Sequence, residues 1–245
     1  RAAEWRLWGA CSYKWAYLPS HIMAVIPCPM GHTCRPRRAH FATIHRLEDS
    51  IVPYNISFIS LGCAKNQVNC EQMMASVQAA GHTIQAQPEG ADVVVVNTCG
   101  FLQSACEEAI DNILEMAELK RAGQVQKILV TGCMTQRYKQ DVLNELPEVD
   151  GILGTGSYGD ICAAIDEVMA GSGLRPCHLG NIHTAPQDGG RILSTPPWYA
   201  YLRIAEGCDN HCAYCVIPSL RGKYRSRPME GLLEEARELA DAGVK

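Results

Sequence analysis

The sequence predicts an α/β protein: a parallel sheet with helices on both faces, followed by a shorter second part that opens with one more β/α unit. Three observations lead to this fold class. Strand-forming runs alternate with segments of helical periodicity from residue 55 to residue 170, as in consecutive βαβ units. Each of the first three runs leads into a cysteine, and parallel sheets bind ligands at the carboxyl ends of their strands. A further strand, near residue 200, leads into a loop with three cysteines.

Composition places the chain among ordinary globular proteins. Its 245 residues are 47% hydrophobic and 20% charged, enough for more than one domain, and no apolar run is long enough to cross a membrane. The 13 cysteines are odd in number and too sparse for a disulfide-stapled secreted scaffold. Free thiols indicate a reducing compartment, so we expect a cytoplasmic protein.

Residues 1–51 differ from the rest of the chain. They hold seven Lys or Arg against three Asp or Glu, whereas the later residues hold fifteen against twenty-three. They do not begin with Met, and their apolar residues show no sustained helical or strand periodicity. The spacing of Cys28 and Cys34 fits no zinc-site pattern. We interpret them as a non-native or disordered extension, with the native start near Val52. The acidic remainder gives no indication of direct nucleic-acid binding.

The first unit begins with the strand 56–61, which leads into Gly62-Cys63. A helix that ends near Gly81 is expected next. Its apolar stripe at helical spacing consists of Val68, Cys70, Met73, Met74 and Val77. This position predicts that Cys70 packs in the core.

The second unit begins with the β-branched run 93–96, which is typical of a strand buried on both faces and leads into Cys99. Ser104 and Glu107 have the spacing of a capping box for a helix that stops at Gly123. The inward stripe of this helix consists of Cys106, Ile110, Ile113 and Ala117. Cys106 is therefore another core candidate.

Two further units complete the sheet. The strand 127–131 leads into Cys133 and a helical stretch over 138–146, which Pro147 terminates. The strand 151–153 precedes a helix over 158–170. Its inward positions are Ile161, Cys162, Ile165 and Met169. Between them, Gly154-x-Gly156 is weak evidence for a nucleotide site, because the full glycine fingerprint is missing.

The three cysteines that follow strands are candidate metal ligands. Cys63 and Cys99 are 36 residues apart, and Cys99 and Cys133 are 34 apart, which is about one βαβ unit each. Neighbouring strands would then bring the three sulfurs to one sheet edge. The alternative is three buried thiols placed there by chance.

A second set of cysteines lies beyond a Gly- and Pro-rich connecting segment, residues 171–197. A strand over 200–205 leads into a loop with the spacing C-x3-C-x2-C, formed by Cys208, Cys212 and Cys215, and a helix is expected over 230–242. Three thiolates are one short of a closed zinc or iron-sulfur site, so one metal position stays open for a ligand. The alternative is a zinc knuckle with His211 as fourth ligand.

This loop resembles the cluster-binding loop of radical S-adenosylmethionine (SAM) enzymes, which also carries an aromatic residue directly before the third cysteine, here Tyr214. The resemblance implies that Cys208, Cys212 and Cys215 hold a [4Fe-4S] cluster and act in catalysis. It also implies that SAM chelates the open iron, with Tyr214 beside the adenine.

Residues 52–245 as a whole resemble the methylthiotransferase family. The motifs that carry this resemblance are SLGCAKN (60–66), NTCGF (97–101), TGCM (131–134), PEVD (147–150), IAEGCDN (204–210), VIPSLRG (216–222) and YRSRP (224–228). One departure is Asn69-Cys70, where the family commonly has Asp-Ser. The resemblance implies a methylthiotransferase domain over 52–170, a linker over 171–197, and over 198–245 the start of a radical SAM (β/α) barrel truncated after its first unit.

The resemblance is greatest to the branch that modifies a ribosomal protein. It implies transfer of a methylthio group to the β-carbon of an aspartate in the twelfth small-subunit ribosomal protein. The cofactors would be SAM and two [4Fe-4S] clusters, the second one on Cys63, Cys99 and Cys133, and the electron donor a flavodoxin or ferredoxin. We expect no membrane partner, and we expect the fragment alone to be inactive. Three arginines either position anionic groups or are solvated: Arg221, Arg225 and Arg227.

Two alternatives remain. The tRNA-adenosine branch of the same superfamily usually carries Gln-Met-Asn where this chain has Ala64-Lys65-Asn66. A non-catalytic zinc or other metal-binding module is the alternative from another class, and iron and sulfide analysis separates it from the enzyme.

Overall fold

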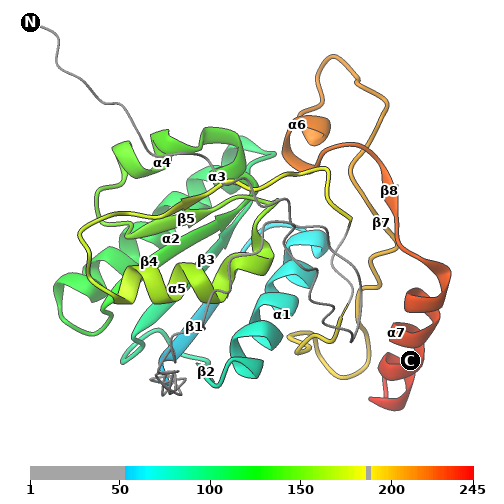
Figure 1. Cartoon of the computed structure of the whole chain (residues 1–245), viewed down its shortest axis with the longest axis horizontal. Coiled ribbons are helices and arrows are strands. Elements are labelled where there is room, and N and C mark those ends of the chain that lie inside the picture. Colours follow the sequence, from blue (N-terminus) through cyan, green and yellow to red (C-terminus); the bar gives the residue numbers. More distant parts are fainter. Residues whose placement is uncertain (1–52, 186–188) are drawn as a thin grey trace, which may run out of the picture. The chain divides into compact units, whose positions relative to one another are not determined.

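One parallel sheet of six strands, in the order β2-β1-β3-β4-β5-β6, organises the protein (Figure 1). The computed structural model describes residues 53–185 and 189–245, so the predicted extension 1–51 and its Cys28 and Cys34 lie outside the described residues. The strands are β1 (Asn55–Ser60), β2 (Thr83–Gln85), β3 (Val93–Thr98), β4 (Lys127–Gly132), β5 (Gly151–Leu153) and β6 (Cys177–His178). The strands expected at β1, β3, β4 and β5 are confirmed, whereas the short β2 and β6 extend the sheet at its two edges.

Helices cover both faces of the sheet, as the fold class predicted (Figure 1). The helices of this part are α1 (Ala64–Ala79), α2 (Gln103–Arg121), α3 (Cys133–Tyr138), α4 (Gln140–Glu145) and α5 (Ile161–Met169), with a 3-10 turn, η1 (Tyr158–Asp160), before α5. Alternation along β3 divides the core: Val94 and Val96 pack with α2, α3 and α4, whereas Val93 and Val95 pack with α1 and α5.

Three local predictions about the helices that cover the sheet are wrong. Helix α2 begins at Gln103 with Leu102 as N-cap and no side-chain cap, so Ser104 lies inside the helix and forms no capping box. The side chain of Ile110 is 37% exposed, because Ala109 and Met116 complete the inward stripe in its place. The third helical stretch begins directly at Cys133 and is divided into α3 and α4 at Lys139, whose φ is +51°.

The three cysteines assigned to helix stripes lie in the helix layers. Cys70 and Cys106 are buried, and Cys162 is half-buried, with its Sγ donating to the Ser76 carbonyl oxygen at 3.6 Å. Burial raises the pKa of the Cys70 thiol to about 12, an effect that the Ser60 side chain opposes. Cys70 is thus a packing residue.

We expect Cys70 to resist alkylation in the folded protein. With a pKa of about 12, only about one part in ten thousand of the thiol is ionised at pH 8, and its side chain is out of contact with solvent. Iodoacetamide in the absence of metal should label the exposed Cys212 within minutes and Cys70 only after denaturation, as read by peptide mass spectrometry. Equal labelling rates at the two positions would contradict this burial.

The second part has little regular structure before its last helix. It contains α6 (Ile217–Arg221), α7 (Met229–Asp241) and two short strands, β7 (Ala205–Glu206) and β8 (Arg225–Ser226), which pair antiparallel. The strand expected over 200–205 is wrong for all but Ala205, because residues 200–204 have no strand partner. The helix expected over 230–242 is confirmed as α7.

Buried ion pairs tie this second part to α1. Glu71 is 1% exposed and accepts from Arg191 at 2.9 Å and from the backbone and hydroxyl of Ser194. Arg191 also contacts Glu235 of α7 at 3.0 Å, and Glu235 pairs in turn with Arg227. All described residues belong to one compact unit, Asp49–Lys245. The domain boundaries at 170 and 198 stay predictions.

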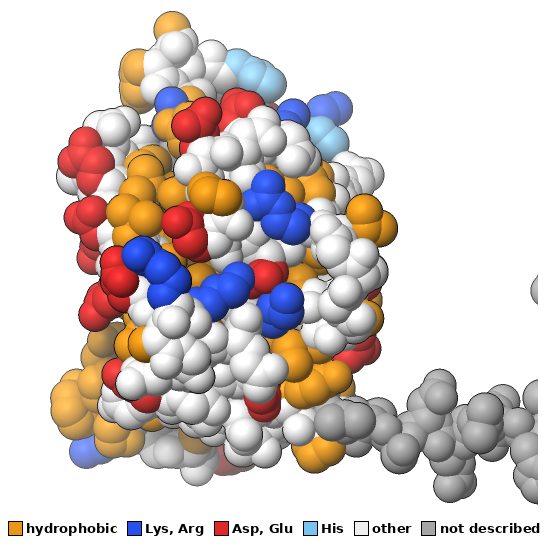
Figure 2. Space-filling view, turned by 90° about the vertical axis from the view of Figure 1, so that its left-hand side faces the viewer, with side chains coloured by type: hydrophobic (Ala, Val, Ile, Leu, Met, Phe, Trp, Pro, Cys, Tyr) orange, Lys and Arg blue, Asp and Glu red, His pale blue; other side chains and the backbone are white. Residues whose placement is uncertain are grey.

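Charges on the surface are mixed in sign. The face in Figure 2 shows Lys and Arg side chains interspersed with Asp and Glu rather than gathered by themselves. Exposed or half-exposed pairs of this kind include Arg121 with Glu118 at 2.8 Å and Lys127 with Asp150 at 3.3 Å. In the part of the chain that the structure describes, no helix is long and apolar enough to cross a membrane.

Candidate functional site

The sheet register places three cysteines side by side at one edge. Strands β1, β3 and β4 are neighbours, with Ser60 paired to Asn97 and Thr98 paired to Gly132. Each cysteine follows its strand by one to three residues: Cys63 is the N-cap of α1, Cys99 follows β3, and Cys133 begins α3. This edge includes the point between β1 and β3 where the strand order reverses direction. Open parallel sheets bind ligands at such a point.

Cys63, Cys99 and Cys133 line one cavity of about 700 Å³. Cys63 is exposed, whereas Cys99 and Cys133 are buried in its wall. The far side of the cavity is formed by the second part of the chain, through Glu206, Gly207, Ile217, Leu220 and Arg221. Within residues 53–185 and 189–245, no three Cys, His, Asp or Glu side chains are already arranged to hold a metal ion, so the ligand roles stay predictions.

Glycines allow the close approach of these strand ends. Gly132 has φ +106°, and a Cβ there would lie 2.3 Å from the Thr98 carbonyl oxygen. Gly62 has φ +93°, and its Cβ would lie 2.8 Å from the Cβ of Cys99. Any side chain at either position would push neighbouring thiol-bearing segments apart.

Asn66 fixes the ends of β1 and β3 relative to α1. It is fully buried, and its Nδ2 donates to the carbonyl oxygens of Leu61 at 3.1 Å and Thr98 at 2.8 Å. The backbone carbonyl oxygen of Asn66 accepts a hydrogen bond from Asn97 Nδ2 at 2.7 Å. Its Oδ1 accepts from the guanidinium of Arg221 and from the Cys133 thiol. The motif residue Asn66 therefore has a structural role that the spacing of the cysteines did not indicate.

Arg221 joins the two cysteine-bearing parts. It ends α6, six residues after Cys215, and it is 4% exposed. Its guanidinium donates to Asn69 Oδ1 at 2.7 Å and to the Cys133 sulfur at 3.2 Å. Burial alone lowers the pKa of Arg221, but Tyr158, Cys133 and Glu206 outweigh burial, so that its pKa lies above its ordinary value and the group stays charged. The interpretation as a solvated loop residue is wrong for Arg221.

Charge also acts on Cys133. Burial raises the pKa of this thiol, and Arg221 opposes the rise both by its charge and by its hydrogen bond. Cys63 and Cys99 lie near enough to contribute a smaller rise. The thiolate form of Cys133 is therefore favoured by Arg221 and disfavoured by burial and by the neighbouring Cys63 and Cys99.

Glu206 is the acidic centre of the contact between the two parts. It is 6% exposed and lies 3.4 Å from both Arg203 and Arg221, and 3.7 Å from Lys65 of α1. Lys65 also donates to the Ala205 carbonyl oxygen at 2.7 Å. These contacts hold the start of the second cysteine loop against the first cavity.

The loop with Cys208, Cys212 and Cys215 opens from this anchored base. The Cys208 amide donates to the Gly222 carbonyl oxygen at 3.1 Å, and the Cys215 amide donates to that of Cys212 at 2.9 Å. Cys208 and Cys215 are half-buried, Cys212 is exposed, and Tyr214 is 87% exposed. The three thiols do not line the 700 Å³ cavity, although the neighbouring Gly207 does.

Comparisons with known proteins find one family model and several similar proteins that share a name. Residues 55–154 match the model of the uncharacterized protein family UPF0004. Three relatives bear the name ribosomal protein uS12 methylthiotransferase RimO: those of Syntrophomonas wolfei (50% identical over 192 residues), Lachnoclostridium phytofermentans (47% over 194) and Clostridioides difficile (46% over 191). Each alignment covers 78% of this chain and 43% of the relative, so the chain spans less than half the length of the relatives it matches.

Among solved structures, the chain is similar in fold to TsrM, a radical S-adenosylmethionine methyltransferase from Kitasatospora setae. The TM-score is 0.56 at 12% identity, and the alignment covers 78% of this chain and 46% of TsrM. A likeness at this identity concerns the fold alone, and it agrees with the α/β class predicted from strand and helix alternation.

Proposed function

We propose that this chain, which is RimO-like over the 78% of its length that aligns with RimO proteins, carries the cysteines that hold the sulfur-carrying cluster and the radical-generating cluster of a radical SAM methylthiotransferase. The proposed reaction transfers a methylthio group to the β-carbon of an aspartate in ribosomal protein uS12. An electron donor such as a flavodoxin or ferredoxin belongs to the same proposal.

One observation carries the proposal: Cys63, Cys99 and Cys133 line a single cavity whose opposite wall leads into the loop of Cys208, Cys212 and Cys215. The two cysteine sets are far apart in sequence, yet Arg221 of the second part contacts the Cys133 sulfur of the first. A sulfur-carrying site and a radical-generating site must act on one substrate carbon, and this adjacency supports such a division of labour.

The residues present fit two iron-sulfur clusters. Each set supplies three thiols, the soft ligands that iron-sulfur clusters prefer, and leaves one iron open. Arg221 favours the thiolate of Cys133. When bound, the clusters and SAM supply the radical chemistry that removes hydrogen from an unactivated carbon.

The remaining residues position the two sets. Asn66 holds the ends of β1 and β3, and therefore the backbone that carries Cys63 and Cys99. Lys65 and Glu206 hold the base of the second loop. Tyr214 is exposed beside Cys215, where an aromatic face is free to stack on an adenine ring.

Anaerobic reconstitution with iron and sulfide tests the proposal. We expect about eight iron and eight sulfide per chain, four of each per [4Fe-4S] cluster. Replacing Cys99 by Ala should halve both values. A chain that takes up zinc without sulfide would instead be the non-catalytic metal-binding module.

The identity of the substrate is tested separately. A chain extended to the length of the RimO relatives should modify purified uS12, with a methylthio mass shift on an aspartate-containing peptide, and should leave tRNA unmodified. Modification of tRNA adenosine alone would favour the other branch of the superfamily.

A further inference from the structure

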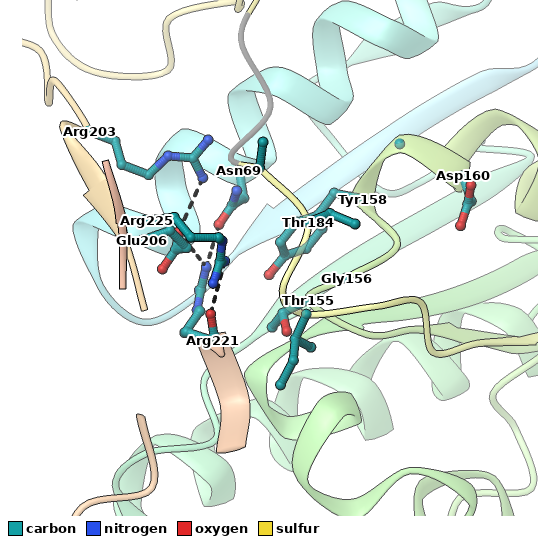
Figure 3. A pocket seen from close by; sticks show the side chains of 13 residues that line it. Asn69, Thr155, Gly156, Tyr158, Asp160, Thr184, Arg203, Glu206, Arg221 and Arg225 are labelled. Carbon is teal, nitrogen blue, oxygen red and sulfur yellow. Dashed lines mark hydrogen bonds and ion pairs between the residues drawn. The ribbon is translucent and has the colours of Figure 1, made fainter. Parts of the chain in front are cut away.

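A second, smaller cavity lies behind Arg221 and belongs to neither cysteine set. Its volume is about 220 Å³ (Figure 3). Arg221 and Glu206 line both this cavity and the larger one, so the two share a wall. The walls of the small cavity come from η1 and the preceding loop, from the β7/β8 pair and from residues 182–185.

Positive charge dominates one end of this cavity. Arg203, Arg221 and Arg225 all line it, and Figure 3 shows the three side chains gathered around Glu206. Glu206 lies 3.4 Å from Arg203 and from Arg221 and 3.7 Å from Lys65, so its single negative charge faces three cations. The other carboxylate on the wall, Asp160, lies apart from the arginines in the same view.

Arg225 has no acidic partner among the described residues. Its two terminal nitrogens donate to backbone carbonyl oxygens, those of Lys223 and, at 3.0 Å, Arg221. Its Nε is buried and makes no hydrogen bond within residues 53–185 and 189–245. A buried guanidinium nitrogen of this kind is costly unless an acceptor meets it.

Tyr158 supplies a second unused donor. Its side chain is 7% exposed, its hydroxyl makes no hydrogen bond to any described residue, and Figure 3 shows the hydroxyl directed toward the arginines. Burial raises the pKa of Tyr158, so the hydroxyl keeps its proton and remains a donor. Two residues that line one cavity thus each carry a buried donor without an acceptor among residues 53–185 and 189–245.

We infer that this cavity binds a small oxyanion of the phosphate class, held by Arg225 and Tyr158. An anion supplies acceptors for both unused donors and a negative charge beside Arg225, which has no acidic partner among the described residues. The volume of about 220 Å³ is below the range of about 300 to 1,000 Å³ that holds drug-sized ligands, so the site fits a free ion or a single phosphate group of a larger molecule.

Equilibrium dialysis of the full chain with radiolabelled inorganic phosphate tests the site, with chloride keeping the ionic strength constant. We expect saturable binding of one phosphate per chain. Arg225→Gln should weaken it about tenfold and Tyr158→Phe about fivefold, because each removes one hydrogen bond to a charged group. Arg121→Gln is the matched control: it removes an exposed guanidinium on α2 and should leave phosphate binding unchanged.

Tyr158→Phe removes one oxygen atom, so its fold is preserved even where Arg225→Gln proves unstable by circular dichroism. Absence of saturable binding to the unaltered chain, or binding by the folded Tyr158→Phe variant as tight as that of the unaltered chain, would overturn the inference. Adenosine monophosphate distinguishes the source. If adenosine monophosphate displaces the labelled phosphate, the site admits a phosphate group that is attached to a nucleoside. If it does not, free phosphate is the ligand.

Discussion

Replacing Cys208 by Ala should abolish reductive cleavage of SAM, the largest effect that we expect from any single substitution. Two thiols cannot hold a [4Fe-4S] cluster with an open iron, so SAM loses its binding position. The measurement is deoxyadenosine by mass spectrometry after anaerobic reduction, in a chain extended to the length of the RimO relatives. Cys177→Ala is the control, because Cys177 is exposed on β6 and belongs to neither set.

Replacing Cys133 by Ala should abolish a different step of the reaction from the one that the Cys208 substitution abolishes. Deoxyadenosine formation remains measurable, because the second cysteine loop is intact, whereas the methylthio product on uS12 disappears. Iron in the reconstituted chain should fall by about half in both variants. A variant lacking Cys63, Cys99 and Cys133 that still attached a methylthio group would show that these thiols do not carry the sulfur.

Asn66→Leu should destabilise the protein by about 3 to 5 kcal/mol, the largest stability effect that we expect. The side chain is fully buried, and its loss removes the donor that Asn66 supplies to the carbonyl oxygens of Leu61 and Thr98. It also takes one acceptor from the buried guanidinium of Arg221. Urea unfolding of the metal-free chain under reducing conditions measures the free energy of unfolding.

Asn69→Asp is the matched control for this prediction. Asn69 accepts one hydrogen bond, from Arg221 at 2.7 Å, and an aspartate keeps that acceptor while adding a charge opposite the guanidinium. We expect a change of less than about 1 kcal/mol. The same substitution introduces the residue that the methylthiotransferases resembled by this chain commonly have here. If both variants lost equal stability, the hydrogen bonds of Asn66 to the strand ends would not be the cause.

The sheet could be predicted from the sequence because its central strands carry their own signal. The run Val93–Val96 is β-branched throughout, and both faces of β3 are buried as that composition requires. The positions of Cys63, Cys99 and Cys133 followed from the same reasoning, since three neighbouring parallel strands end at one edge. Local pattern was sufficient for the existence of these strands, but not for helix details such as the N-cap of α2 or the exposed side chain of Ile110.

Features that depend on distant partners could not be predicted. Strand β6 has only two residues, which is too short to show the alternation of apolar and polar residues that marks a strand. It is a strand because it pairs with β5. The run 200–205 favours a strand by composition, but only Ala205 finds a partner, Ser226. Arg221 was named as one of three loop arginines, and only the fold shows that it contacts Cys133, which lies 88 positions earlier in the sequence.

The contact between Arg221 and Cys133 also has a consequence for the order of events during translation. A ribosome makes the chain from its amino end, so Cys63, Cys99 and Cys133 are all synthesised before Arg221 exists. Until then the sheet edge lacks the wall that Leu220 and Arg221 provide, and the Cys133 thiol lacks the only cation that contacts it among the described residues. Until Arg221 is made, the three thiols therefore lie at a more open sheet edge, and Cys133 is without the hydrogen bond that Arg221 donates in the finished protein.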